Sequence, residues 1–390
     1  MNPAHIVRRF ESVPSPSTPY SSGVVQLTVG SHRDDATSDV VLSAHKFNRH
    51  TFWCGQSGSG KTYALGVVLE QLLLNTRLPL LILDPNADFT RLPETRDTTD
   101  PDLAAAIAAT DIQVLHSTRR DLPQLRARFT DLPLTAKAAV LQLDPIADAD
   151  EYNVLLHADA TLSGGGADDT PDQDTYISAL RASDEPGHQR LAKRIENLQV
   201  LDWDLWARGE VAATDIIDER PQATVLDLGG FAHPAEPKVA ALSVLEHLWA
   251  HREERRPVLI VIDEAHNICP PVATSAVEQA LIDRVVQIAA EGRKFGLWLL
   301  LSTQRPTKIH PNVLSQCDNL CLMRMNAPRD LAELADTFGF VGEHMLAESP
   351  EFRQGEALFA GGFITTPTFT RMGARITEEG GADVGVPLLA

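Results

Sequence analysis

Cysteines, aromatic residues and long apolar runs are all scarce in this 390-residue sequence. The four cysteines are too scattered for a disulfide framework and too widely spaced for a zinc site, and we expect buried thiols in a reducing cytoplasm: Cys54, Cys269, Cys317 and Cys321. The longest apolar runs, residues 257–262 and 297–301, have the length of strands and fall short of the ~20 residues that span a membrane. No apolar secretory signal opens the chain. We therefore expect a cytoplasmic protein without a membrane anchor.

Positive charge is also in short supply. The formal net charge is −19, with a sequence pI near 5.0. This charge argues against a broad basic surface for nucleic acid, although a few basic residues could still line a narrow channel. The apolar fraction of 43% is typical of a globular protein with a substantial core.

Composition and pattern divide the chain into four parts. Residues 1–22 are rich in proline and serine and are interpreted as a loose leader. Residues 134–218 are strongly acidic, have helical spacing and include a flexible glycine-rich loop at 163–169. We interpret them as a helical subdomain inserted between two parts of one core, residues 23–133 and 219–390.

Apolar strands alternate with amphipathic helices in both parts of this core. Several of the strands are continuously apolar, which is typical of parallel strands buried on both faces. The predicted strands are residues 24–29, 50–54, 78–83, 223–228, 257–262, 297–302, 319–325, 356–360 and 368–373. The predicted helices are residues 63–74, 237–252 and 274–294. This alternation predicts a doubly wound α/β fold.

One segment fits the phosphate-binding pattern G-x-x-x-x-G-K-[ST], and its residues are Gly55, Gln56, Ser57, Gly58, Ser59, Gly60, Lys61 and Thr62. The glycines allow backbone N–H groups to point at the α- and β-phosphates. Lys61 would reach the β- and γ-phosphates, and the Thr62 hydroxyl would ligate Mg²⁺. A predicted strand before the segment and a predicted helix after it supply the context that this mechanism needs. The sequence therefore predicts that ATP binds here with Mg²⁺.

Two later strands end in polar residues that suit catalysis. Asp263 and Glu264 follow the strand at 257–262. Asp263 would hold Mg²⁺ together with Thr62, and Glu264 would polarise the attacking water as a general base. Gln304 follows the next strand, whose end lies at the same edge of a parallel sheet, so it could contact the γ-phosphate or the water. Alternatively, its amide caps a loop.

The combined motifs resemble the HerA/FtsK superfamily of ring-forming P-loop ATPases, and its HerA-like branch in particular. The resemblance covers residues 40–375 and rests on blocks at 48–50, 55–62, 83–89, 225–229, 262–267, 291–296, 302–306 and 314–318. It implies a RecA-like P-loop NTPase core with a mainly parallel sheet, a helical insertion and a short N-terminal β segment. Only about 45 residues precede the strand of the phosphate-binding loop, which is too few for the N-terminal β-barrel of the family.

The resemblance also assigns two further residues. Arg293 matches the residue that reaches a neighbouring subunit's γ-phosphate as an arginine finger, where a planar guanidinium neutralises charge on the transferred group. Alternatively, Arg293 only caps the helix at 274–294. Asp84 would lie near the Mg²⁺ or order its water ligands. His266 could couple nucleotide state to a pore, or be an ordinary buried histidine.

The resemblance implies a homo-oligomeric, hexameric ring that pulls DNA through its pore and could serve a nuclease or a phage-defence effector. A regulatory ATPase, which gates a partner effector without moving along DNA, is the main alternative. A conjugation or secretion motor is a third, and the lack of an apolar membrane segment argues against it.

Overall fold

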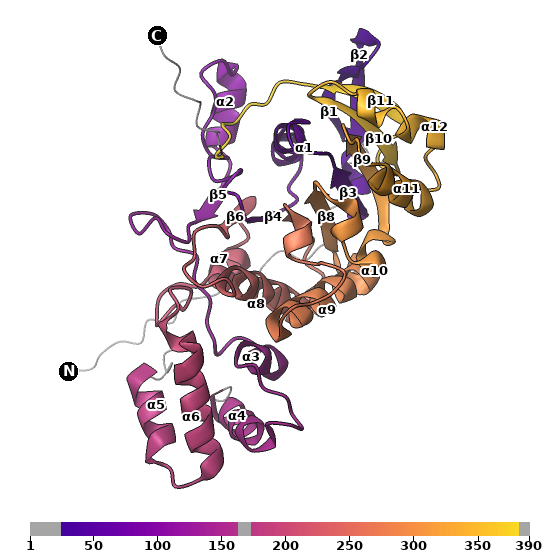
Figure 1. The fold of residues 1–390 in the computed structure, drawn as a ribbon. Coiled ribbons are helices and arrows are strands. Elements are labelled where there is room, and N and C mark those ends of the chain that lie inside the picture. The colour runs from indigo at the N-terminus through magenta and orange to yellow at the C-terminus, as the bar shows by residue number, and fades with distance from the viewer. Residues whose placement is uncertain (1–24, 163–172, 382–390) are drawn as a thin grey trace, which may run out of the picture.

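The computed structural model describes residues 25–162 and 173–381. The predicted leader at residues 1–22 and the glycine-rich loop at 163–169 lie outside the described residues. Figure 1 shows a wide twisted sheet with helices against it and a group of helices projecting from one end.

Eleven strands form a single sheet in the described part of the chain, in the order β2-β1-β11-β10-β9-β3-β8-β7-β4-β6-β5. Every neighbouring pair from β9 to β5 is parallel, and every pair from β9 to β2 is antiparallel. The strands are β1 Gln26–His32, β2 Asp35–Ser43, β3 His50–Cys54, β4 Leu80–Asp84, β5 Ile112–Leu115, β6 Ala223–Asp227, β7 Val258–Ile262, β8 Leu297–Thr303, β9 Cys317–Met323, β10 Glu356–Gly361 and β11 Thr368–Met372. The mainly parallel sheet confirms the predicted α/β class.

The α-helices are α1 Lys61–Asn75, α2 Pro101–Ala108, α3 Leu134–Val140, α4 Ala149–Leu162, α5 Gln173–Ala182, α6 Pro186–Leu198, α7 Ala213–Glu219, α8 Glu236–Ala250, α9 Ala276–Glu291, α10 Pro311–Leu314, α11 Pro328–Thr337 and α12 Glu343–Leu346. The 3₁₀ turns are η1 Ala44–Asn48, η2 Val200–Asp202, η3 Arg252–Glu254, η4 Ala265–Asn267, η5 Gly292–Phe295, η6 Pro306–Lys308 and η7 Ser349–Glu351.

Side chains of the central strands alternate between two apolar cores, one on each face of the sheet. Phe52 and Ile260 pack into the core that contains α8 and α9. Trp53 packs into the core that contains α1. Because these strands are buried on both faces, they are continuously apolar. The prediction of buried parallel strands from these apolar runs is confirmed.

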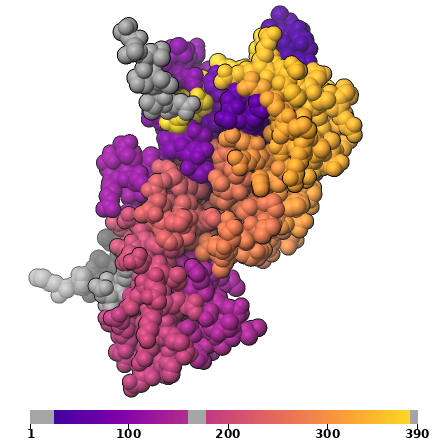
Figure 2. Space-filling view, viewed as in Figure 1, coloured from indigo at the N-terminus to yellow at the C-terminus, as the bar shows by residue number. Residues whose placement is uncertain are grey.

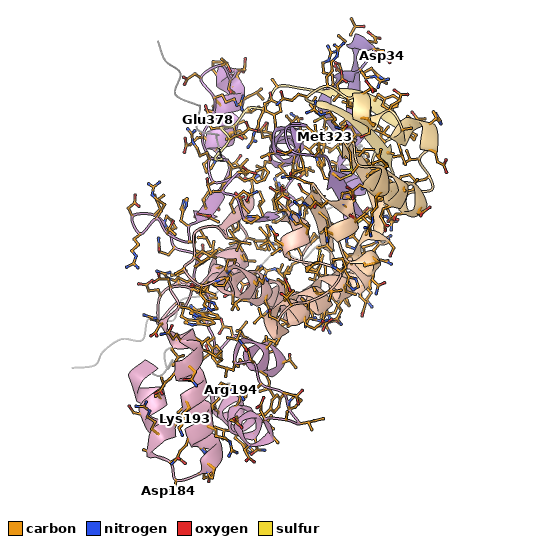
Figure 3. The ribbon with its side chains drawn as sticks, in the orientation of Figure 1. Asp34, Asp184, Lys193, Arg194, Met323 and Glu378 are labelled. Carbon is orange, nitrogen blue, oxygen red and sulfur yellow. The ribbon has the colours of Figure 1, made fainter. Side chains whose placement is uncertain are left out.

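Helices α3 to α6 form a lobe that projects away from the sheet (Figure 1), and the space-filling view shows it as a magenta and pink protrusion at the lower end (Figure 2). Ion pairs hold α4 and α6 together within it. Arg194, on α6 (Figure 3), lies 2.5 Å from Asp148 Oδ1 and 3.5 Å from Glu151 Oε1. Lys193 on the same helix carries a further positive charge (Figure 3). The acidic composition of residues 134–218 is thus partly balanced by internal arginines, and its status as a separate inserted subdomain stays a prediction.

The structure contains two strands that the sequence did not predict, β2 and β5. Five of the nine residues in β2 are Asp, Thr or Ser, and β5 is a four-residue strand at the edge of the sheet. Neither carries the apolar run on which the other strand predictions depended. Within residues 25–162 and 173–381, no helix is long and apolar enough to cross a membrane.

Candidate nucleotide site

The segment between β3 and α1 forms a phosphate-binding loop. Gly58 and Gly60 have φ values of +73° and +88°, which side chains of L-residues rarely adopt. A Cβ on Gly60 would also lie 3.2 Å from the Gly355 backbone nitrogen. Gly60 is the N-cap of α1 and offers no capping side chain, so the first N–H groups of the helix are available to an anion. This loop opens onto a pocket of about 620 Å³.

Lys61 is the centre of a buried polar cluster. Its Nζ lies 2.7 Å from Asp263 Oδ1, 2.8 Å from Ser302 Oγ and 3.4 Å from Glu264 Oε1. Burial alone would lower the pKa of Lys61, but the carboxylates of Asp263 and Glu264 raise it. Lys61 is therefore a permanent cation at the mouth of the loop. The structure brings together four of the predicted residues here, because β3, β8 and β7 end side by side. These residues are Lys61, Asp263, Glu264 and Gln304.

Asp263 follows the last residue of β7 and is fully buried. Its Oδ1 accepts from Lys61 and from Ser302, whose Oγ is 2.6 Å away, whereas its Oδ2 has no hydrogen-bond partner. An unpartnered buried carboxylate oxygen is costly unless a ligand completes it. Asp263 Oδ2 therefore suits a cation or its water ligand.

Glu264 is held by three neighbours in a left-handed backbone conformation, with φ 43° and ψ 48°. Gln304 Nε2 donates to Glu264 Oε1 at 2.8 Å, and His266 Nδ1 lies 3.2 Å from Glu264 Oε2. Burial would raise the pKa of Glu264, but His266, Lys61 and Gln304 together lower it to about 2. Glu264 is therefore ionised, and the Gln304 amide holds its Oε1. A non-glycine residue in this conformation is a strained position of the kind found at active sites.

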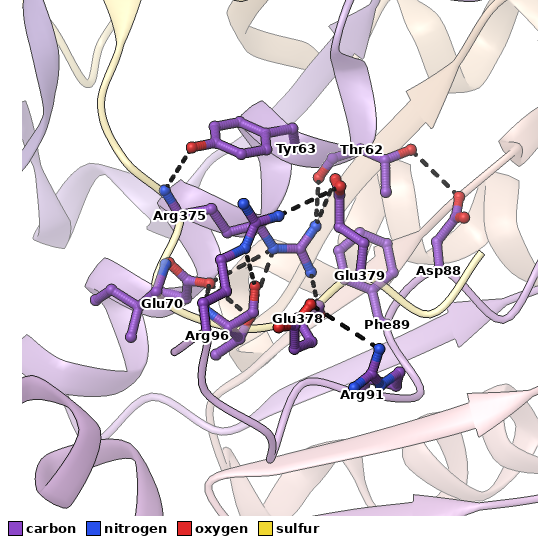
Figure 4. Close-up of polar contacts among 12 residues, drawn as sticks. Thr62, Tyr63, Glu70, Asp88, Phe89, Arg91, Arg96, Arg375, Glu378 and Glu379 are labelled. Atoms are coloured by element: carbon purple, nitrogen blue, oxygen red, sulfur yellow. Dashed lines mark hydrogen bonds and ion pairs between the residues drawn. The ribbon is translucent and has the colours of Figure 1, made fainter. Parts of the chain in front are cut away.

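Asp84 supports a loop in this structure. Its carboxylate accepts from the backbone N–H groups of Asn86, Asp88 and Phe89, at 3.3, 3.0 and 2.7 Å. This loop presents Asp88, whose Oδ2 accepts from Thr62 Oγ1 at 3.2 Å (Figure 4). Burial and, to a lesser extent, the nearby Asp263 charge raise the pKa of Asp84 to about 7 and that of Asp88 to about 6.

The assignment of Asp84 to the metal stays a prediction, and the structure adds Asp88 as the carboxylate in contact with Thr62. Sequence reasoning did not select Asp88, although it lies in the 83–89 block that carried the resemblance. The sequence offered one signal for Asp88, namely that a second acidic residue follows Asp84 in the loop after the strand.

Mg²⁺ fits the donors that converge here, namely Thr62 Oγ1, Asp88 and the unpartnered oxygen of Asp263. Among the described residues, no group of three or more His, Cys, Asp and Glu is arranged to hold a metal ion. In nucleotide sites, Mg²⁺ is commonly held by one or two protein ligands together with phosphate oxygens and water.

Arg293 lies far from this cluster, at the opposite edge of the sheet. It belongs to η5, immediately before β8, whereas Gln304 follows β8. A seven-residue strand separates them by roughly 23 Å at about 3.3 Å per residue. Arg293 Nη1 donates to Asp318 Oδ2 at 2.9 Å, and its side chain is 35% exposed. The structure therefore does not bring Arg293 to the phosphate-binding loop of its own chain.

The family of the central domain of helicase HerA matches residues 27–232, just over half of the chain. The chain belongs to this HerA family. Its sequence is 30% identical over 131 residues to the probable DNA double-strand break repair helicase HerA of Methanocaldococcus jannaschii, covering 34% of this chain and 25% of that protein. It is 25% identical over 173 residues to the DNA double-strand break repair helicase HerA of Sulfurisphaera tokodaii, covering 42% and 34%. The matched region thus spans a quarter to a third of these HerA relatives.

The fold of this HerA-family chain is similar to that of the plasmid coupling protein TrwB in complex with ADP and Mg²⁺. The two structures align with a TM-score of 0.57 over 92% of this chain and 97% of the other, at 12% sequence identity. This likeness establishes the RecA-like fold that the motifs implied. The HerA family, the fold and the site are together those of a P-loop ATPase.

Proposed function

We propose that the chain is an ATP-driven motor that hydrolyses ATP at Lys61, Asp263 and Glu264 and uses the energy to move DNA through a ring. The buried cluster around Lys61 carries the proposal. It places a cation, an unpartnered carboxylate oxygen and an oriented base beside a phosphate-binding loop. Membership of the HerA family supports the same chemistry.

In this proposal the residues divide the work of phosphoryl transfer to water. The loop amides and Lys61 bind the β- and γ-phosphates and neutralise charge that develops on them. Thr62, Asp88 and Asp263 would hold Mg²⁺, which supplies further charge neutralisation when bound. Glu264 accepts a proton as the water oxygen attacks the γ-phosphorus, and ADP leaves. Gln304 and His266 keep the Glu264 carboxylate in place.

Arg293 supports a ring because its position suits action on a neighbouring subunit. It lies at the edge of the sheet opposite to its own nucleotide site, and its ion-pair partner among the described residues is Asp318, at the surface. A surface pair of this kind contributes roughly 0–1 kcal/mol, so exchanging Asp318 for a phosphate is inexpensive. We propose a homo-oligomeric ring, hexameric by resemblance, with Arg293 as its finger. A nuclease or defence effector served by the motor is part of the same proposal.

DNA would be contacted by few residues, since the net charge is −19. Arg305 and Lys308 are exposed and follow β8 at the nucleotide edge of the sheet. They could contact phosphates in a pore. The acidic charge favours a second candidate, a regulatory ATPase whose nucleotide state gates a partner without moving DNA.

DNA-stimulated ATP hydrolysis separates the two candidates. Turnover of the purified protein should rise when duplex DNA is added, and the stimulation should weaken as salt increases from 50 to 200 mM, because phosphate contacts are salt-dependent. A Lys61→Ala variant controls for contaminating ATPases. Turnover that is indifferent to DNA at every salt concentration would favour the regulatory ATPase.

A further inference from the structure

Residues 373–381, which follow β11, run back across α1 to the loop that presents Asp88, and we call this segment the strap. It is fixed there by backbone contacts. Arg96 N donates to Ile376 O at 2.9 Å, Glu378 N to Glu94 O at 2.8 Å, and Gly380 N to Asp88 O at 3.1 Å. Figure 3 places Glu378, which follows β11 in the sequence, near α2. The strap therefore joins the two elements that supply Thr62 and Asp88.

Arg375 anchors the strap beneath α1. Its side chain is fully buried, and Figure 4 shows its guanidinium pointing into a ring of polar groups. Nη1 lies 3.3 Å from the Thr62 carbonyl oxygen and 3.1 Å from Glu379 Oε1, and Nη2 lies 3.3 Å from the Glu378 carbonyl oxygen. Nε lies 3.6 Å from Glu70 Oε1. One guanidinium thus connects the strap to the first turn of α1.

Glu70 provides the buried countercharge, and the strap wraps around it. The backbone N–H groups of Ile376 and Thr377 donate to the Glu70 carboxylate, each at 2.8 Å, and Thr377 Oγ1 donates at 2.6 Å. Glu70 is 1% exposed. A buried charge pair is retained with so many hydrogen bonds where it fixes one arrangement of the chain.

Two glycines show how closely the strap fits. Gly66 lies inside α1, where glycine is unfavourable, and a Cβ there would lie 2.6 Å from the Arg375 guanidinium. A Cβ on Gly381 would lie 2.3 Å from Asp88 Oδ1. The missing side chains of these two glycines therefore leave space for Arg375 and for the strap where it passes Asp88.

The same segment forms a wall of the nucleotide pocket. Gly373, Ala374 and Glu379 line the pocket opposite the phosphate-binding loop, together with Tyr63. Tyr63 Oη accepts from the Arg375 backbone N–H at 2.8 Å. Movement of the strap would therefore shift the pocket wall and Thr62 together.

We propose that Arg375 is a positioning residue for nucleotide binding and hydrolysis, which holds Thr62 and the Asp88 loop in register through the strap. The proposal rests on the ATPase function proposed above. It predicts that loosening the strap impairs the nucleotide site even where the fold survives.

Arg375→Lys is the sharpest test. Lysine keeps a positive charge beside Glu70, but a single ammonium cannot reproduce the guanidinium fork that reaches Thr62, Glu378 and Glu379 together. We expect the melting temperature to fall, because lysine leaves buried acceptors without a donor, but the protein should remain folded at the assay temperature. The ADP concentration at half-saturation should rise about tenfold and kcat should fall about tenfold or more, since a shift of ~1 Å at a catalytic group costs up to about 10²-fold. Hydrogen exchange of residues 61–66 should accelerate.

Arg91→Lys is the matched control. Arg91 also contacts the strap, through Glu378 at 3.9 Å, but its side chain is 45% exposed and it contacts no residue of the phosphate-binding loop. This variant should have wild-type ADP affinity, kcat and exchange. A purely structural role for Arg375 predicts lower melting temperature with unchanged ADP affinity and kcat below that temperature.

Tyr63→Phe decides the matter if Arg375→Lys does not fold. It removes only the hydroxyl that accepts from the strap, and one such bond is worth about two- to tenfold. ADP affinity should fall by that factor, and exchange of residues 374–381 should accelerate. Wild-type ADP affinity and exchange in a folded Arg375→Lys protein, or in Tyr63→Phe, would overturn the proposal. If the wild type binds ADP without hydrolysing ATP, the proposed function fails, while ADP affinity and exchange still test the strap.

Discussion

The two ends of the parallel strands, the carboxyl ends and the amino ends, form two edges of the sheet that present their charged groups in different ways. At the edge where β3, β7 and β8 end, the carboxylates of Asp263 and Glu264 each lie within 3.4 Å of Lys61 Nζ, and all three side chains are at most 6% exposed. At the edge where β8 begins, Arg293 has one partner, Asp318, and both side chains are at least one-third exposed. The first edge holds a site with its donors in place. The second holds a cation at the surface, where its partner can be exchanged.

This difference separates the interactions that are completed within one chain from those that can be completed by a second chain. Charges removed from water must be satisfied within the fold, so their arrangement defines a site by itself. An exposed ion pair contributes little and leaves the arginine free to take a better partner. Mutations at the two edges should therefore differ in whether a second subunit can rescue them.

Lys61→Ala should have the largest effect. It removes the cation that faces the phosphates, so turnover should fall by at least about 10²- to 10³-fold. It also leaves Asp263 and Glu264 buried without their countercharge, which costs about 3–5 kcal/mol of stability. Steady-state phosphate release and thermal melting measure both effects. Appreciable turnover in the purified, folded variant would show that the nucleotide site lies elsewhere.

Glu264→Gln should retain nucleotide but hydrolyse it about 10²- to 10⁴-fold more slowly, because the amide cannot accept the proton from water. Thr62, Asp88 and Asp263 stay in place, so binding persists. Filter binding should detect trapped ATP without phosphate release. Asp97→Asn is a suitable control, since Asp97 is exposed and is not among the residues that line the nucleotide pocket. Hydrolysis at the wild-type rate would assign the base to another residue.

Arg293→Ala should lower turnover by up to about 10³-fold if the residue acts on a neighbour's γ-phosphate. The folding cost should be only the loss of a surface pair, about 0–1 kcal/mol. Lys294→Ala is the matched control, because Lys294 is adjacent and pairs only with Glu291 at the surface. If Arg293 only caps α9, both variants should behave alike.

Mixing subunits sharpens this test. Arg293→Ala chains keep an intact phosphate-binding loop, and Lys61→Ala chains keep an intact arginine. Mixed rings then contain boundaries where both parts are present, so activity should partly return. Absence of rescue in rings shown by native mass measurement to contain both chains would argue against action in trans.

His266→Leu should reduce kcat by about tenfold, a moderate effect, because one of the groups that orient Glu264 is lost. His266→Asn should recover much of this loss, since its amide can donate from nearly the same position as Nδ1. The half-saturating ATP concentration should change little in either variant. Equal losses in both would indicate that the imidazole has a different role.

Asp88→Asn tests the charge balance at the nucleotide edge through a small change in stability, measured without nucleotide or Mg²⁺. The folded state raises the pKa of Asp88 from 3.8 to about 6, so ionised Asp88 opposes folding. Its contribution is therefore most favourable below pH 4 and is lost as the pH rises through 6. Without nucleotide or Mg²⁺, the variant should gain on the order of 1 kcal/mol over wild type at pH 8 and nothing at pH 4. Thermal melting at the two pH values measures this difference.

Much of the core could be predicted because the relevant signals are local. The strand at His50–Cys54 was predicted with its observed bounds, and so was the position of the glycine loop before α1. Buried parallel strands are continuously apolar, and phosphate-binding loops need glycine at fixed positions, so each prediction needed only a short window of sequence.

The remaining features depend on contacts between distant residues. Glu70 and Thr377 are 307 positions apart, and nothing near either residue marks it as half of a buried cluster. Asp84 and Asp88 are both acidic and lie in one loop, and only the path of the backbone decides which of them faces Thr62. The polar edge strand β2 carries no apolar pattern to distinguish it from a loop.

The order of strands in the sheet also has a consequence for synthesis on the ribosome. β3, which leads into the phosphate-binding loop, is paired only with β8 and β9, and His50 precedes its partner Leu299 by 249 residues. At about 5–20 residues per second, the ribosome needs roughly 12–50 s to supply that partner. During this time the apolar face of β3 and its unpaired edges lack their native neighbours, so the nascent chain depends on protection from aggregation. The phosphate-binding loop is thus synthesised well before β8 and β9, and the nucleotide site is completed only after those strands are made.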